Sequence, residues 1–363
     1  MKRKLLVLVL VIAMCAVLPS CGKTDTSTGE ETKENYELEL NIQHHIILDT
    51  DTAGDDAMAI MMACIADNVQ IEGLTVLAGN VNIDQATKNA LQVLEEVGCD
   101  QIPVYKGAST TYTGRKRSCF SVFGEDGMGD AGLIHPKKEA EKGDAVDFIL
   151  DTVKKYPDEI EIVMIGPATN IAMAIDRDKE TMSHVKRIWS MGTAGFGQGN
   201  ATPVAEFNVY NDAEAYDVVL SSGIPITVVG LDMCEDDSTV FSKLDMKELA
   251  EGSEQGAFLV KSWGKLLDFR EKNKNLNTVD VCDAVAMACM VIDNMILETK
   301  ECHAVCITDD SAAYGQVIFF RKDMAYDSMP KISNYETTVC YKIDNNLFRG
   351  MKKILSGKVS VEG

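Results

Sequence analysis

Short runs of branched apolar residues alternate with amphipathic segments along the chain after about residue 44. Apolar runs bounded by Gly, Pro or polar residues predict β-strands, and apolar positions spaced three and four apart predict α-helices. Strands are expected at 46–48, 71–78, 103–105, 160–165, 185–191 and 226–231. Helices are expected at 56–66, 83–97, 145–155, 171–175, 212–221, 256–270 and 283–292, with a long loop from 107 to about 135.

This alternation predicts an α/β fold that is Rossmann-like, with a mostly parallel central sheet flanked by helices. The chain shows no internal repeat and no second linker, so residues 44–363 are expected to form a single domain. In sheets of this kind ligands bind beyond the carboxyl ends of the strands. Residues that follow or end the predicted strands, such as Asp51, Asn80, Ile165 and Met191, are therefore candidates for a site.

The first 43 residues differ in composition from the rest. Three basic residues precede an apolar run at 5–18, which is too short to span a membrane comfortably. The run ends in Leu-Pro-Ser-Cys, which resembles a bacterial lipoprotein processing site. We predict a signal peptide at 1–20, a lipid on Cys21 that anchors the protein outside the cytoplasm to a bacterial membrane, and a flexible polar tether at 21–43. The alternative is an ordinary secretory signal or a short membrane helix.

The net charge restricts the class of ligand. The 363 residues include 35 Lys and Arg against 56 Asp and Glu, a formal net charge of −21. Such a surface repels phosphate backbones, which excludes nucleic acid and favours a neutral or cationic small molecule. Two of the 11 cysteines belong to the export signal, and the others form no Cys-x-x-Cys pair. Neither a zinc site nor a disulfide framework is indicated, and buried thiols are the expectation.

Four aspartates lie within eight positions, between the first predicted strand and the first predicted helix: Asp49, Asp51, Asp55 and Asp56. Crowded carboxylates repel one another and lose solvation on burial, so the arrangement favours a bound cation or a proton-transfer role. A haloacid-dehalogenase-type phosphatase would use Asp49 and Asp51, but Ala53 replaces its usual Thr or Val, and it needs no second acidic pair. Several carboxylates with nearby carbonyls are instead typical of a Ca²⁺ site.

Two further segments offer candidate polar groups. Glu206 and Asn208 flank the apolar Phe207, and in an extended segment this spacing would place both polar side chains on one side, where they could bind sugar hydroxyls. The alternative is a surface loop whose Asp212 caps the next helix. Asp283 opens an apolar helix, either as its N-cap or as a further metal ligand.

Together these motifs resemble the inosine–uridine-preferring nucleoside hydrolase family. The resemblance extends from residue 46 to at least residue 292 and includes, in order, 49–56, 79–80, 166–170 and 205–208. The family signature reads Asp-x-Asp-x-Gly-x-Asp-Asp, and here Ala53 stands where glycine is usual, with Gly54 directly after it. The resemblance implies hydrolysis of ribonucleosides to ribose and a free purine or pyrimidine base, by a homodimer or homotetramer.

The resemblance also implies a role for each matching residue. Ca²⁺ would be held by three carboxylates and one backbone carbonyl, those of Asp51, Asp56, Asp283 and Ile165. The ribose would be held by Asp55, Asn80, Met191, Glu206 and Asn208. Asp51 would also act as the general base toward the attacking water, and Asp49 would support the site from behind. The Asn208 carbonyl would stabilise the positive charge of an oxocarbenium-like transition state.

Two departures from the family pattern lie on the leaving-group side. Many family members place a histidine directly before the last metal aspartate, where it protonates the departing base, and here that position is Cys282, as in one branch of the family. A thiol, with an unperturbed pKa of about 8.5, is a poorer acid at neutral pH than imidazolium. A second family histidine corresponds to Phe123, which either stacks on the base or anchors a loop. These losses leave open a different class, a non-catalytic, calcium-dependent nucleoside-binding lipoprotein.

Overall fold

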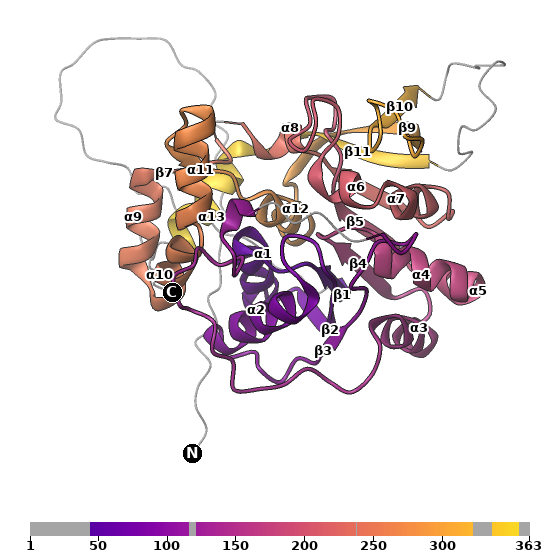
Figure 1. The fold of residues 1–363 in the computed structure, drawn as a ribbon, viewed down its shortest axis with the longest axis horizontal. Helices are drawn as coiled ribbons and strands as arrows, with labels where there is room; N and C mark the ends of the chain where they lie inside the picture. The colour runs from indigo at the N-terminus through magenta and orange to yellow at the C-terminus, as the bar shows by residue number, and fades with distance from the viewer. Residues whose placement is uncertain (1–43, 116–120, 237, 322–335, 356–363) are drawn as a thin grey trace, which may run out of the picture.

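A nine-stranded β-sheet forms the centre of the molecule (Figure 1). The computed structural model describes residues 44–115, 121–236, 238–321 and 336–355. The strand order is β10-β9-β11-β6-β5-β4-β1-β2-β3. These strands are β1 (His44–Thr50), β2 (Val69–Val76), β3 (Val104–Lys106), β4 (Ile160–Met164), β5 (Arg187–Met191), β6 (Ile226–Val229), β9 (Ile296–Cys306), β10 (Val317–Arg321) and β11 (Glu336–Ile343). From β11 to β3 all neighbours are parallel, and only the pairs of β9 are antiparallel.

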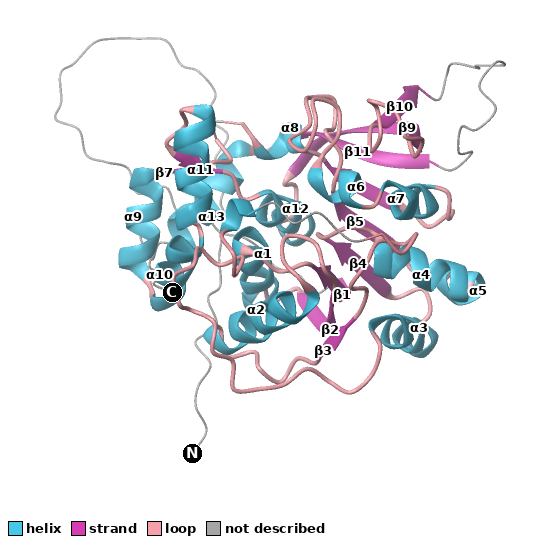
Figure 2. Ribbon diagram, viewed as in Figure 1, coloured by secondary structure: helices cyan, strands magenta, loops and turns pink. Residues whose placement is uncertain are grey.

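Helices cover both faces of this sheet (Figure 2). They are α1 (Gly54–Ile65), α2 (Ile83–Glu96), α3 (Ala145–Lys155), α4 (Thr169–Arg177), α5 (Lys179–Met182), α6 (Phe207–Asn211), α7 (Ala213–Leu220), α8 (Leu231–Cys234), α9 (Lys243–Gly252), α10 (Glu254–Ser262), α11 (Gly264–Lys274), α12 (Cys282–Val291) and α13 (Asn345–Leu355). A 3-10 turn, η1, spans Ser121–Phe123, and β7 (Phe241–Ser242) pairs with β8 (Thr278–Val279). The predicted single α/β domain with a mostly parallel sheet is confirmed.

Strand β1 shows why the sequence folds this way. Its side chains alternate between two hydrophobic cores, because successive residues of a strand point to opposite faces of the sheet. Ile46 and Leu48 belong to the core that α1, α2 and α12 cover, and Ile47 belongs to the core that α3, α4 and α7 cover. All three side chains are fully buried, as expected for a central strand of a parallel sheet with helices on both faces.

The parallel strands bring candidate polar groups to one edge of the sheet. Strands β2, β1, β4 and β5 are consecutive neighbours, and their carboxyl ends meet. Asp51 follows β1, Asn80 follows β2, Ile165 follows β4, and Met191 ends β5. Residues more than 100 positions apart in sequence therefore surround one site, as the strand–helix pattern predicts.

The prediction that Glu206 and Asn208 lie in an extended segment is wrong. Helix α6 begins at Phe207, and Glu206 is its N-cap, with an extended backbone. The Glu206 carboxylate accepts hydrogen bonds from the backbone N–H groups of Asn208 and Val209. These bonds satisfy backbone donors that lack a partner within the helix and therefore favour a helical turn.

Two other helix starts differ from expectation. Asp283 is the second residue of α12 rather than its N-cap, which is Val281. Asp212 stands at the N-cap of α7 but makes no capping bond, and its Oδ2 accepts a bond from Thr169 Oγ1 instead. The helix predicted at 256–270 is two helices, α10 and α11, which meet at Trp263. The indole of Trp263 donates to the carbonyl of Gly54, which ties this corner to the start of α1.

Within the described residues, no helix is both long and apolar enough to cross a membrane. The predicted signal peptide, Cys21 and the tether lie outside the described residues. The C-terminal strands β9, β10 and β11 had no counterpart among the predicted elements. Strand β11 joins β6 in parallel, and β9 and β10 extend the sheet beyond it through antiparallel pairs.

Candidate active site

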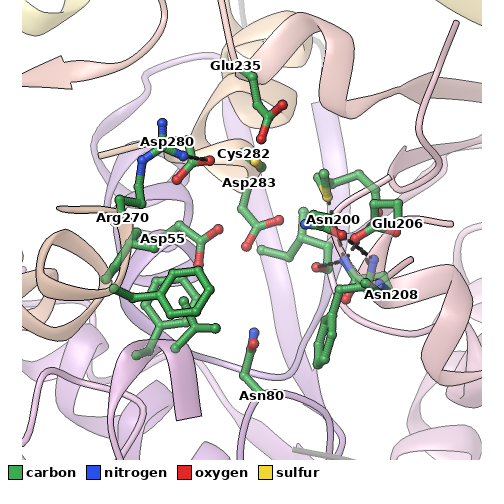
Figure 3. A pocket seen from close by; sticks show the side chains of 18 of the residues that line it. Asp55, Asn80, Asn200, Glu206, Asn208, Glu235, Arg270, Asp280, Cys282 and Asp283 are labelled. Carbon is green, nitrogen blue, oxygen red and sulfur yellow. Dashed lines mark hydrogen bonds and ion pairs between the residues drawn. The ribbon is translucent and has the colours of Figure 1, made fainter. Parts of the chain in front are cut away.

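A cavity of about 400 Å³ lies at the carboxyl edge of the sheet (Figure 3). Its lining includes eleven residues with polar or thiol side chains: Asp55, Asn80, Asn200, Glu206, Asn208, Glu235, Arg270, Lys274, Asp280, Cys282 and Asp283. Carboxylates of Asp55 and Asp283 point into the centre, with Asn208 and Glu206 on one side and Arg270 and Asp280 on the other (Figure 3). A cavity of this size suits a small molecule.

The start of α1 places two of the four clustered aspartates. Asp55 and Asp56 occupy its first turn, where the positive end of the helix dipole favours negative charge. The Asp56 carboxylate accepts bonds from Thr50 Oγ1 at 2.5 Å and from the Ala53 backbone N–H at 2.8 Å. Oδ1 of Asp55 is buried and accepts no hydrogen bond from any residue that the structure describes.

Asp283, in the first turn of α12, lies next to this pair although it is more than 200 residues away in the sequence. Carboxylate oxygens of Asp55, Asp56 and Asp283 lie within 4.8 Å of one another, and all three residues are buried. Burial raises the pKa of Asp55 and of Asp56 to about 7, and it raises the pKa of Asp283 well above its ordinary value. Repulsion by neighbouring carboxylates adds to each shift, from Asp51 and Asp280 at Asp55 and from Asp55 at the other two. A divalent cation would neutralise these charges and bind the unpartnered Asp55 oxygen. The three carboxylates therefore fit a metal ion.

The other two aspartates of the sequence cluster do not line the cavity: Asp49 lies behind it and Asp51 beside it. Asp49 is fully buried behind the cavity, and its Oδ1 accepts bonds from Thr75 Oγ1 at 2.6 Å and Asn170 Nδ2 at 2.8 Å. Oδ2 of Asp51 accepts the backbone N–H of Asn80 at 2.5 Å. A Cβ atom at Gly79 would lie 2.0 Å from that same oxygen, so only glycine allows the two strand ends to approach so closely.

Helix α6 supplies the opposite side of the cavity. Nδ2 of Asn208 donates to the carbonyl of Ile165 at 2.9 Å and, more weakly, to that of Met191 at 3.4 Å. These bonds fix the amide, so its carbonyl oxygen is the group left to meet a ligand. Burial raises the pKa of Glu206 to about 7, although three backbone N–H groups oppose the shift. The pair combines a hydrogen-bond acceptor with a carboxyl group, which suits sugar hydroxyls.

The third side of the cavity is apolar with charged groups at its edge. Val122, Phe123, Leu266 and Phe269 line it and could contact a flat ring. Cys282 also lines the cavity, and a hydrogen bond with the Cys234 thiol together with burial raises its pKa well above the ordinary value. Two ion pairs, Arg270 with Asp280 and Lys274 with Glu235, complete this side.

The sequence pattern described as inosine-uridine preferring nucleoside hydrolase matches residues 46–350. The chain belongs to this family. Uridine nucleosidase 1 of Arabidopsis thaliana is 36% identical over 275 residues, which cover 74% of this chain and 81% of that protein. The pyrimidine-specific ribonucleoside hydrolase RihB of Escherichia coli (strain SE11) is 31% identical over 274 residues, 75% of this chain and 86% of that protein.

Solved structures show the same relationship. The plant nucleoside hydrolase PpNRh1 superposes with a TM-score of 0.82 at 26% identity, over 87% of this chain and 99% of that one. The purine-preferring ribonucleoside hydrolase of Gardnerella vaginalis gives 0.76 at 28% identity, over 87% of this chain and 100% of that one. The protein is therefore a nucleoside hydrolase, an enzyme that cleaves N-glycosidic bonds.

The structure of this nucleoside hydrolase brings the residues of the family resemblance together. Asp55, Asn80, Ile165, Met191, Glu206, Asn208, Cys282 and Asp283 all line the one cavity. Asp51 and Asp56 lie beside it, since Asp51 raises the pKa of Asp55 and Asp56 raises that of Asp283. The closest trio of carboxylates contains Asp55 in place of Asp51. Which of the two ligates the metal, and each role within the site, stays a prediction.

Sequence reasoning missed the ion pair of Arg270 and Asp280, which lines the cavity. Arg270 belongs to a predicted helix and Asp280 follows the loop after it, so neither stood out by pattern. One signal was available, because Asp280 lies three residues before Asp283 and hence near the predicted metal. Its neighbour Arg270 could be found only from the way α11 packs against the cavity.

Proposed function

We propose that this nucleoside hydrolase uses Ca²⁺ to hydrolyse the N-glycosidic bond of ribonucleosides, releasing ribose and a free purine or pyrimidine base. The observation that carries the proposal is the layout of one cavity. The carboxylate cluster of Asp55, Asp56 and Asp283 lies opposite Glu206 and Asn208, whose polar groups suit sugar hydroxyls. The apolar side chains of the same cavity would contact the base. The names of the similar proteins, which act on uridine or pyrimidine ribonucleosides, support the same chemistry.

We assign the metal to Asp51, Asp56, Asp283 and the carbonyl of Ile165, with Asp55 close enough to take part. An all-oxygen set with several carboxylates suits Ca²⁺ better than zinc or other metals that prefer nitrogen and sulfur. When bound, Ca²⁺ would hold the two ribose hydroxyls and the attacking water together and would lower the cost of charge at that water. The unpartnered oxygen of Asp55 and the clustered charge support a cation in this position.

The reaction adds the oxygen of water to C1′ of the sugar and breaks the bond from C1′ to the base. We assign Asp51 as the general base that takes the proton of the water. The Asn80 backbone N–H that binds its Oδ2 would orient this carboxylate. Asp55, Asn80, Met191, Glu206 and Asn208 would hold the ribose, and the Asn208 carbonyl oxygen would face the positive charge that develops on the sugar ring.

The departing base takes the electron pair of the broken bond and gains a proton, either from an acid in the site as the bond breaks or from water afterwards. Cys282 occupies the leaving-group side of the cavity, beside the apolar wall. Its raised pKa keeps the thiol protonated but makes it a weak acid. Bases that leave readily without protonation, or that are activated by stacking on Phe123, are therefore the expected substrates.

Release of reducing sugar from a panel of nucleosides, with added Ca²⁺ and with a chelator, tests this proposal. We expect turnover that depends on Ca²⁺. The non-catalytic, calcium-dependent nucleoside-binding lipoprotein is the other candidate, because both family histidines are replaced in this chain, by Cys282 and Phe123. Measurable nucleoside binding with no turnover of any substrate would establish that candidate instead.

A further inference from the structure

The ion pair on the leaving-group side has no role in the chemistry above. Arg270 pairs through Nη1 with Oδ2 of Asp280, and both residues line the cavity. Asp280 lies beside Cys282, across the cavity from Asn208 (Figure 3). We propose that Asp280, held in place by Arg270, selects the base by accepting a hydrogen bond from the ring N3–H of uracil, so that uridine is preferred to cytidine. This inference rests on the proposed nucleoside site.

The position of the pair follows from the layout of the cavity. The groups assigned to ribose include Asn80, Glu206 and Asn208, and Glu206 and Asn208 lie on the side of the cavity opposite Arg270 and Asp280 (Figure 3). A base attached to that ribose would extend toward Cys282 and the apolar part of the lining, which includes Phe123 and Phe269. In an apolar wall the edge of the base needs a polar partner, because an unpaired N–H or carbonyl is costly there.

Asp280 is a polar group on this side of the cavity whose orientation is fixed by its ion pair with Arg270. Its Oδ2 is engaged by Arg270, whereas Oδ1 accepts no bond from another side chain in the described ranges. Arg270 is buried, with its side chain 4% exposed, and its Nη2 also lies 3.4 Å from Thr278 Oγ1. A guanidinium anchored in this way holds its partner carboxylate in one direction, and its charge opposes the rise that burial causes in the pKa of Asp280. Arg270 is thus a positioning residue and Asp280 the group that would touch the base.

The second ion pair of the wall cannot give the same discrimination. Lys274 and Glu235 are 39% and 40% exposed, so water competes for both charges. An exposed pair of this kind contributes little binding energy, whereas a buried acceptor left unpaired, or facing another acceptor, weakens binding strongly. Glu235 is therefore a matched comparison for Asp280, since both are ion-paired acids that line the same cavity.

The chemistry of the pyrimidine ring gives the sign of the preference. Uracil carries a hydrogen on N3, which can donate to a carboxylate, whereas cytosine carries a lone pair there, which a carboxylate repels. A site built to bind one donor rejects an analogue that lacks it by a large factor. One charge-assisted bond of this kind corresponds to a ratio of about 10- to 100-fold between uridine and cytidine.

The first test changes the ligand and leaves the protein intact. Dissociation constants by calorimetry and kcat/KM are measured on the full chain for uridine, cytidine, 3-methyluridine and 5-methyluridine. We expect cytidine and 3-methyluridine to lose about 10- to 100-fold against uridine, and 5-methyluridine, which adds the same methyl group but keeps N3–H, to lose much less. Equal values for the two methylated nucleosides, or for uridine and cytidine, would overturn the inference.

The second test changes the acceptor. Asp280→Asn presents an amide N–H that can donate to N3 of cytosine, so the uridine-to-cytidine ratio should fall at least about tenfold. Glu235→Gln should alter both substrates by the same factor and leave the ratio unchanged. Arg270→Lys, which keeps the charge, should retain part of the preference that Arg270→Met loses. A ratio unchanged in Asp280→Asn contradicts the role given to Asp280.

These readouts separate the inference from the proposed function. If the protein hydrolyses no nucleoside, the hydrolase proposal fails, and the ranking of dissociation constants for the four ligands still decides the role of Asp280. If it hydrolyses nucleosides with no difference between uridine and cytidine, the proposed function stands and Asp280 does not select the base.

Discussion

The side-chain amide of Asn208 donates a hydrogen bond to the backbone carbonyl of Ile165 over 2.9 Å, which joins α6 to the end of β4. The bond connects a residue predicted to hold ribose with a residue predicted to bind the metal. It also explains why α6 can be only five residues long and still present a defined side chain, since Asn208 is anchored at both backbone and amide. Changes at this helix should therefore affect catalysis more than stability.

Replacing Asn208 by alanine should lower kcat/KM by about 100-fold, because the substitution removes a preorganised dipole near the developing charge. Steady-state release of reducing sugar measures the loss. The control is Asn211→Ala at the end of the same helix, whose side chain makes no hydrogen bond within the part of the chain that the structure describes. If both variants lose activity equally, the effect comes from α6 as a whole and not from the Asn208 amide.

Asp283→Asn should have opposite effects with and without Ca²⁺. In the metal-free protein at neutral pH, Asp283 must take up a proton to be buried beside Asp55 and Asp56. The substitution removes this cost and should raise the Tm by about 2 to 4 °C. With Ca²⁺ at about 100 times its Kd, the natural protein gains about 2.7 kcal/mol and the variant much less. Thermal unfolding of both proteins, with Ca²⁺ and with a chelator, measures whether the order of their Tm values reverses. Asp147→Asn, at an exposed position on α3, should change neither curve.

Glu161, near the start of β4, should make the free energy of unfolding depend on pH in the acid range. Burial acts to raise its pKa, but bonds from His44, Lys186 and Trp189 outweigh burial and lower the pKa to about 2. Because the folded-state pKa is below the unfolded value near 4.5, the stabilisation is complete above about pH 4.5 and is lost as the pH falls to about 2. Glu161→Gln should cost about 1 to 3 kcal/mol at pH 7.

Urea unfolding at several pH values measures this contribution. The difference between the natural protein and Glu161→Gln should shrink through the window from pH 4.5 to 2. A difference that stays constant down to pH 2 would mean that Glu161 is not the group whose titration destabilises the fold. The site is far from the cavity, so kcat at neutral pH should be nearly unchanged in the variant.

Cys282→His should raise turnover of nucleosides whose bases need protonation to leave. An imidazole has an unperturbed pKa near 6.5 and supplies a stronger acid than the buried thiol. The pH profile of kcat should gain a limb that falls as the new histidine loses its proton. Cys282→Ala, which supplies no proton, is the control, and equal rates in the two variants would show that this position does not protonate the base.

The N-terminal prediction concerns the location of the enzyme. We expect Cys21 to carry lipid and to hold the protein on the outer side of a bacterial membrane through the tether at 21–43. Incorporation of labelled palmitate into the natural chain and its loss in Cys21→Ala would support this. A soluble, unlabelled natural chain would instead favour an ordinary secretory signal.

Much of the fold could be predicted from local patterns. The helical periodicity at 83–97 and 145–155 predicted amphipathic helices, and the short branched apolar run at 46–48 predicted a strand; α2, α3 and β1 confirm these predictions. The segment at 206–208 shows the limit of this approach. Alternation of polar and apolar residues predicted an extended chain there, yet the Glu206 carboxylate captures two backbone N–H groups and starts a helix.

The C-terminal part of the sheet could not be predicted for a different reason. Strands β9 and β10 are partly exposed, and β9 alternates buried and less buried residues only over its second half. The order of β9, β10 and β11 depends on long-range pairing. Such pairing depends on register and on the neighbour that each strand finds, which a local pattern does not contain. The same holds for the ion pair of Arg270 and Asp280, which α11 and the chain after β8 bring together.

The sequence by itself determined the chemistry available to this protein, because the spacing of Asp49, Asp51, Asp55 and Asp56 places carboxylates at a strand end and a helix start. Tertiary structure alone decided how these groups meet the rest of the site. Asp283 joins Asp55 and Asp56 only because α12 packs against α1, and the cavity gains its apolar wall only because α11 packs beside η1. The local sequence determines which side chains lie at the end of a strand, whereas the packing of helices distant in sequence determines which of these side chains line the same cavity.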